Sequence, residues 1–304
     1  MKLFLKIIGA IIAVLILAFA ALFAVFYFNP ELGEEELTPE QVEIQKIYDA
    51  VETQTGNIHI ESINQINTII IPLARQLIVG TFPTLASRTV NSVSVLEDDA
   101  FNLKVAEQYV KRNMTEEDSL QTAVVLNQLG GVAFCPTADV YLKYPGNGLY
   151  ILYYLDTAIH ELLHALTCES KISAEFPAVW EESFTEYFTM RVLSKYIGMN
   201  TDRISSSPER IKVIKNLHKF VSGDELFRIY LTKDGAALEK SIDNALGRGT
   251  YDALNADMEI VFRQSEYTYI EHSEEGEIGT ASNPRVEDAL QRIDNRLNPA
   301  GQAN

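Results

Sequence analysis

The sequence predicts a mostly helical α+β domain with a small sheet, behind one N-terminal transmembrane helix. Three observations support this prediction. Residues 7–28 contain no charged side chain. Most of the remaining chain shows the apolar spacing of amphipathic helices, with capping residues before several of them. Two short β-type runs, at 132–135 and 140–144, interrupt the helices in the middle of the chain.

The uncharged N-terminal segment is long enough, at about 1.5 Å per residue, to cross a hydrocarbon core of roughly 30 Å. A cleavable signal peptide is the alternative, since Ala18-Phe19-Ala20 offers a small-x-small site. The apolar run, however, outlasts the 7 to 15 or so residues of a signal h-region. Lys2 and Lys6 precede the segment, and a positive flank tends to stay in the cytoplasm. We therefore expect an uncleaved signal anchor, with the following domain outside the cytoplasm. A short anchor with a positive flank is typical of a bacterial cell membrane.

The remaining boundaries of the segments given below follow from the anchor and from the capping signals.

The chain carries 25 basic and 42 acidic residues, a net charge of −17. Such a surface is repelled by nucleic acids and anionic lipids, so we expect no nucleic-acid partner and lipid contact only through the anchor. The expected segments are a cytoplasmic N-terminus (1–6), the anchor (7–28), a linker (29–38), one extracytoplasmic domain (39–297) and a tail (298–304).

Helix starts are marked by an N-cap followed by proline, as in Thr38-Pro39 and Ser207-Pro208. In the segment 58–95 the spacing of apolar residues does not distinguish helix from strand. The apolar run 69–80 within it is interpreted either as part of the core or as an apolar helix that binds the membrane surface. The strand at 138–144 reads either as a core strand or as an edge that offers backbone groups to an extended peptide. Further helices are expected at 39–53, 98–111, 115–129, 224–232, 236–246, 250–263 and 286–297, with a loop at 273–284.

The sequence His160-Glu161-Leu162-Leu163-His164 indicates a metal site. Residues four apart share one face of a helix, so both imidazoles can reach a single ion. Glu161 lies roughly 100° around the helix from His160 and is the candidate general base toward a water on the metal. A coincidental match is expected in about one such chain in a hundred, so a third ligand is needed.

The third ligand is expected on the following helix, because catalytic zinc takes three protein ligands and keeps one position open. Glu182 and Glu186 are four residues apart and share a face, whereas Glu181 is expected to point elsewhere. With Glu182 on the metal, Glu186 can accept the free ring N–H of a ligating histidine.

At this point the chain resembles the gluzincin clan of zinc metallopeptidases, in which a His-Glu-x-x-His helix is followed by a helix with a glutamate ligand. The run from Trp180 to Tyr187 is similar to the Trp-x-x-Glu-Gly-x-x-Glu-Tyr pattern of that clan, with Ser183 in place of the glycine and one residue fewer between Trp180 and Glu182. The resemblance covers residues 150 to 190. It implies a zincin-like domain that binds Zn²⁺ through the ligands His160, His164 and Glu182, with Glu161 as base and Glu186 behind the ligands.

The resemblance also implies a downstream histidine or tyrosine that stabilises the oxyanion of the reaction. His218 and Tyr230 are the candidates, and an ordinary helix position is the alternative for both. The Gly-x-Met-Glu-Asn motif of aminopeptidases is absent, as is the Asn-Glu-x-x-Ser-Asp form of thermolysin-like enzymes. We therefore expect a membrane-anchored endopeptidase acting on extracytoplasmic proteins or peptides.

The two cysteines leave an alternative open. Cys135 and Cys168 can form one disulfide in an oxidising compartment or remain buried thiols. Cys168 lies one turn beyond His164 and could serve as a soft fourth ligand. A closed site of four ligands would indicate a non-catalytic module with a structural or vestigial zinc site.

Overall fold

The structure is a computed structural model. It describes residues 59–111, 130–135, 137–144, 146, 149–168, 176–197, 208–273 and 284–298, all within one unit of the chain, Gln54–Asn304. The expected cytoplasmic N-terminus, anchor and linker and the helices expected at 39–53 and 115–129 lie outside these residues, as do most of the 273–284 loop and the tail. No helix within the described ranges has the length and apolar character needed to cross a membrane.

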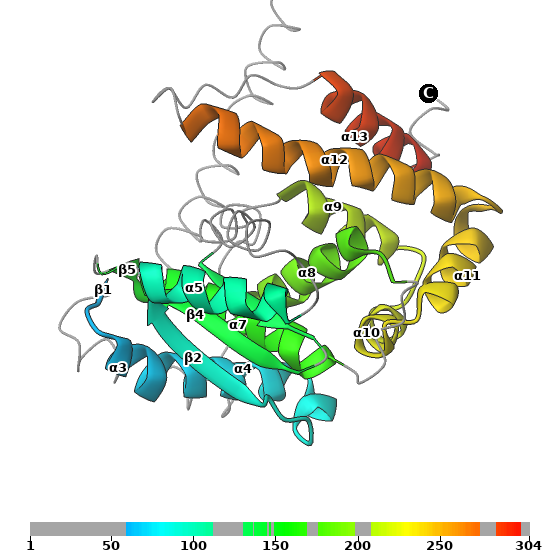
Figure 1. Cartoon of the computed structure of the whole chain (residues 1–304). Coiled ribbons are helices and arrows are strands. Elements are labelled where there is room, and N and C mark those ends of the chain that lie inside the picture. Colours follow the sequence, from blue (N-terminus) through cyan, green and yellow to red (C-terminus); the bar gives the residue numbers. More distant parts are fainter. Residues whose placement is uncertain are drawn as a thin grey trace, which may run out of the picture. The chain divides into compact units, whose positions relative to one another are not determined.

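The predicted α+β class with a small sheet is confirmed, and its three-stranded sheet has the order β2-β4-β3 (Figure 1). Strand β4 (Asp139–Tyr144) pairs in parallel with β2 (Ser92–Glu97) and antiparallel with β3 (Gly131–Phe134). Both predicted strands are found within one residue of their expected starts. Strand β2 begins in the segment 58–95, where the spacing of apolar residues does not distinguish helix from strand. A second, two-residue pairing joins β1 (His59–Ile60) to β5 (Leu149–Tyr150).

Of the two interpretations of 138–144, the core strand is confirmed and the sheet edge is wrong. Strand β4 lies in the centre because Val140, Tyr141 and Leu142 are all buried, which suits a strand paired on both sides. In the described part of the chain the edge strands are β2 and β3.

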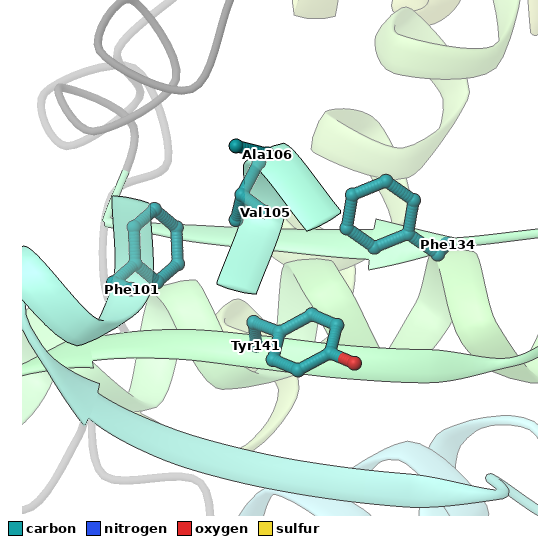
Figure 2. Close-up of a cluster of buried hydrophobic side chains, with 5 residues drawn as sticks. All are labelled: Phe101, Val105, Ala106, Phe134 and Tyr141. Atoms are coloured by element: carbon teal, nitrogen blue, oxygen red, sulfur yellow. The ribbon is translucent and has the colours of Figure 1, made fainter. Parts of the chain in front are cut away.

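Helix α5 (Asp98–Val110) confirms the helix predicted at 98–111, and it covers one face of the sheet. Figure 2 shows its side chains Phe101, Val105 and Ala106 facing Phe134 of β3 and Tyr141 of β4. Side chains alternate across a strand, so the neighbours of Phe134 and Tyr141 point to the opposite face. That opposite face packs against helix α7 (Ile151–Thr167).

The apolar run at 69–80 belongs to the core, one of its two predicted uses. It forms a continuous helical segment made of α3 (Ile63–Gln65), the π-helical turn η2 (Ile66–Ile70) and α4 (Ile71–Thr81). A 3₁₀ turn, η3 (Pro83–Leu85), follows. Leu73, Leu77 and Ile78 are buried, and the segment packs against α7.

The remaining helices follow α8 (Ala178–Ile197). The predicted helices at 224–232, 236–246, 250–263 and 286–297 are confirmed, although α12 continues ten residues further. The helices after α8 are α9 (Pro208–Leu217), α10 (Gly223–Thr232), α11 (Gly235–Leu246), α12 (Thr250–Ser273) and α13 (Pro284–Leu297). Helix α8 is contacted by α9, α10 and α12.

The C-terminal helices fix the beginning of α8. Trp180, in the first turn of α8, donates from Nε1 to Oδ1 of Asn255 on α12 at 2.9 Å. Helix α12 in turn lies beside α13 (Figure 1), where buried Asp257 pairs with Arg292 at 2.7 Å and with Arg296. These contacts hold the turn of α8 that carries Glu181 and Glu182.

Candidate metal centre

Helix α7 presents both histidines of the motif on one face. Leu162 and Leu163 between the histidines are apolar and buried, Glu161 is buried as well, and no glycine or proline interrupts the helix, so the sequence favours a long buried helix. The Nε2 atoms of His160 and His164 lie 3.2 Å apart. Two ring nitrogens therefore converge on one point beside the helix.

Helix α8 brings Glu182 to the same point. Its Oε2 lies 3.4 Å from Nε2 of His160, and its Oε1 lies 3.3 Å from Nε2 of His164. A tetrahedral ion with bonds of 2.0–2.1 Å separates its ligand atoms by about 3.3 Å. The two ring nitrogens and the two carboxylate oxygens are thus separated by distances typical of atoms that bind one zinc ion.

The donor set fits zinc. In the described part of the chain, His160, His164 and Glu182 form the one group of three potential ligands whose atoms all lie within 4.8 Å of one another. Two imidazoles and one carboxylate match the donor set of hydrolytic zinc sites. Cys168 is not a fourth ligand, because it forms a disulfide with Cys135.

Each ligating ring has a carboxylate on its other nitrogen. Oε2 of Glu186 lies 3.3 Å from Nδ1 of His160, and Oε1 of Glu181 lies 3.2 Å from Nδ1 of His164. Such partners fix which ring nitrogen carries the hydrogen and hold the ring plane. The expectation that Glu181 points elsewhere is wrong: α8 runs antiparallel to α7, so its first turn reaches past His164 to the Nδ1 side.

The metal-free cluster is strongly ionic. Burial opposes the charge on His164, but attraction by Glu182 and Glu181 outweighs it and raises the pKa of His164 to about 9. Burial likewise opposes the charge on Glu181, yet His164 and Lys233 lower its pKa to about 2. The pKa of His160 is raised well above its usual value and that of Glu182 is lowered, again against burial. Without metal, protons on the imidazoles balance the carboxylates.

Glu161 lies between α7 and strand β3 and does not belong to the ligand cluster. Its carboxylate accepts a hydrogen bond from the backbone N–H of Ala133. Burial raises the pKa of Glu161, and the two nearby histidines only partly offset this. A buried carboxyl with a raised pKa, adjacent to the metal ligands, suits proton transfer.

Strand β3 turns two of its residues toward α7. The backbone N–H of Lys143 on β4 donates to the carbonyl of Gly130 at 2.8 Å, which fixes the alternation of the antiparallel ladder. By that alternation the N–H and C=O groups of Gly131 and Ala133 point away from β4, to the free edge. The N–H that binds Glu161 is therefore one of these edge groups.

The two candidates for oxyanion stabilisation lie elsewhere. Tyr230 is fully buried, and its hydroxyl is 2.7 Å from Oγ1 of Thr185, which lies 3.4 Å from Nδ1 of His164. Tyr230 is thus behind His164, on the side away from the ligand nitrogens.

His218 is exposed in the turn after α9, not within that helix as expected, and it lies beside Gly223 and Arg191. Arg191 is nine residues beyond Glu182, or roughly 13 Å along α8. The geometry therefore does not bring His218 to the ligand cluster.

Three polar residues at this centre were not predicted from the sequence. Lys233 pairs with Glu181 at 3.0 Å, and Thr185 lies between Tyr230 and His164. Asp156, one turn before His160, has its pKa raised to about 7 by burial and by Glu186. A charged residue on the apolar face of α7 is a signal that could have identified Asp156, whereas a lysine in a loop carries none.

Comparison of the chain with protein-family models, with curated proteins and with solved structures finds no match. The interpretation of this centre depends on its own geometry.

Proposed function

We propose that this protein is a zinc-dependent metallopeptidase of the gluzincin type, held at a membrane by residues 7–28, with its zincin-like domain outside the cytoplasm. The observation that carries the proposal is the cluster of His160, His164 and Glu182, in which the two Nε2 atoms lie 3.2 Å apart and each lies 3.3 to 3.4 Å from one oxygen of the Glu182 carboxylate. Glu161 lies on the same helix beside this cluster. The substrate is a protein or peptide.

The chain's own residues have distinct roles in this proposal. His160, His164 and Glu182 hold the ion, and Glu186 and Glu181 orient the two rings. When bound, zinc supplies positive charge at the scissile carbonyl and lowers the pKa of a water molecule. Glu161 accepts the proton of that water and returns it to the leaving amine, a transfer that its raised pKa favours.

Strand β3 supports the choice of a peptide as substrate. An extended peptide can add to a free sheet edge through backbone hydrogen bonds. The outward groups of Gly131 and Ala133 lie next to Glu161, so a peptide added there would pass the base. The N–H of Ala133 is already used by Glu161, so among the described residues its carbonyl and both backbone groups of Gly131 are the ones that could bind the peptide.

A structural zinc site is the second function considered. Such sites normally have four protein ligands, frequently cysteines. The described residues provide three, and the nearest cysteine, Cys168, is bonded to Cys135. These features favour the enzyme.

The test compares the full-length protein, purified in detergent, with Glu161→Gln and with Glu182→Ala. We expect one zinc per chain and casein hydrolysis in the wild type, zinc without hydrolysis in Glu161→Gln, and loss of both in Glu182→Ala. Glu107→Gln, an exposed change on α5, is the control and should retain both. Zinc without hydrolysis in the wild type as well would favour the structural module, and no zinc at all would refute the site.

A further inference from the structure

Lys233 is a buried lysine in an unfavourable backbone conformation. It follows the last residue of α10 with φ 50° and ψ 40°, the left-handed region that a side chain disfavours. Only 7% of the residue is exposed, and lysine is almost never buried without a partner. Glycine is the usual residue at such a helix end. Lys233 therefore combines two unfavourable features, a left-handed backbone and a buried ammonium group, which indicates a role for this side chain.

The ammonium of Lys233 is directed at the support of one metal ligand. Its Nζ lies 3.0 Å from Oε1 of Glu181, and this same oxygen lies 3.2 Å from Nδ1 of His164. The ammonium also lies 4.0 Å from the ring centroid of Tyr230, a cation–π distance. Tyr230 in turn contacts Thr185, whose Oγ1 is 3.4 Å from Nδ1 of His164. Two routes from Lys233 thus end at the same ring nitrogen.

The two supporting carboxylates differ in how firmly the protein surrounds them. The side chain of Glu186 is 7% exposed, so packing holds it against His160. The side chain of Glu181 is 28% exposed and stands in the first turn of α8. A glutamate in that setting retains rotamer freedom unless another group binds it. Lys233 is the group that does so.

We propose that Lys233 is a positioning residue of the metal centre: its ammonium fixes the Glu181 carboxylate on Nδ1 of His164 and so keeps Nε2 of that ring directed at Glu182 and His160. The inference rests on the metal site of the proposed function. It assigns the lysine no contact with metal or substrate.

The test measures zinc affinity of the full-length protein by competition with a chelator. Lys233→Met retains the length of the side chain and the same backbone preference, so it isolates the ammonium. Loss of a group that supports a ligand weakens metal binding by about 10- to 100-fold, and we expect this loss here. Lys212→Met, which removes an exposed lysine paired with Asp294 on α13, is the matched control and should leave the affinity unchanged.

Two further variants separate positioning from general damage. Glu181→Gln should weaken zinc binding as Lys233→Met does, and the double variant should lose no more than the worse single variant, because both act on one contact. The cobalt-substituted Lys233→Met protein should show a changed visible spectrum, and Lys233→Arg should restore part of the affinity.

Three results would overturn the inference: wild-type or tighter zinc binding in Lys233→Met, an unchanged cobalt spectrum, or additive losses in the double variant. Should Lys233→Met fail to fold, Glu181→Gln decides alone, and wild-type affinity there counts against the inference. Absence of zinc from the wild type would instead refute the proposed function.

Discussion

Replacement of Gly131 by alanine should uncouple the proposed base from an otherwise intact metal site. Gly131 begins β3 and lies against α7, where an added Cβ would be 2.8 Å from Cγ of Glu161 and 3.1 Å from Cγ2 of Thr157. The φ angle of Gly131 lies outside the left-handed region, so alanine can adopt the backbone. The effect of the substitution is therefore steric and is directed at Glu161.

The size of the effect follows from the distances. Carbon atoms in contact lie at about 3.5–4.0 Å, so Glu161 and Gly131 must separate by about 0.7 Å or more. That movement strains the hydrogen bond from the N–H of Ala133, two residues along the same strand. A displacement on the order of 1 Å at a catalytic group costs about 10²-fold in rate, and overpacking costs about 1–3 kcal/mol of stability. We expect kcat to fall by about 10- to 100-fold while zinc remains bound, because the methyl group is aimed at Glu161 and not at the ligands.

The assay combines kcat and KM for a peptide substrate, zinc content and urea unfolding, all on the full-length protein. Ile242→Val in α11 is the control for stability alone, since it removes one buried methyl group at about 0.5–1.5 kcal/mol and lies outside the site. Its kcat should match that of the wild type. Unchanged kcat in Gly131→Ala would refute the reasoning, as would a loss of activity fully explained by lost zinc.

Three more predictions concern protons and the disulfide. Since the pKa of His164 is about 9 and that of His160 is also raised, zinc binding at pH 7 should release about two protons, which calorimetry in buffers of different ionisation enthalpy measures; release of none would contradict the ionic cluster. The pKa of Asp156 is raised from 3.8 to about 7, so its contribution to stability is present below pH 4 and lost as pH rises through 7. Metal-free Asp156→Asn should therefore exceed the wild type by at least about 1.4 kcal/mol at pH 8 in urea unfolding, with no difference at pH 4; equal curves would count against a buried neutral carboxyl. Replacing both Cys135 and Cys168 by serine opens a loop with a separation of 33 residues and should lower the free energy of unfolding by roughly 3 to 4 kcal/mol, whereas a loss below about 1 kcal/mol would show that the disulfide contributes little.

The sequence predicted those features that depend on local spacing. A period of four residues placed His160 and His164 on one face, and the same period related Glu182 to Glu186 on the next helix. Capping and periodicity similarly gave the helices from α9 to α13 and the helix α5. Strand β2 was not separated from its surroundings, because its pairing with β4 joins Ser92 to Asp139 across a long stretch of chain.

The contacts that complete the centre depend on tertiary packing. Lys233 follows His164 by 69 residues, and nothing in its neighbourhood distinguishes it from a surface lysine until α10 is placed behind α8. The same holds for Ala133, since an alanine carries no side-chain signal and acts here through its backbone N–H. Glu181 shows the limit most directly: helical period separates it from Glu182 by about 100°, yet both reach His164 because they approach different nitrogens of one ring. Residues that bind the same metal ion can be identified because they share one face of a helix. Residues that support a histidine ligand need only contact the other nitrogen of its ring, and they can lie on a different face. Supporting residues of such a centre are therefore found by asking what lies at the second nitrogen of each histidine, a question that only the packed structure answers.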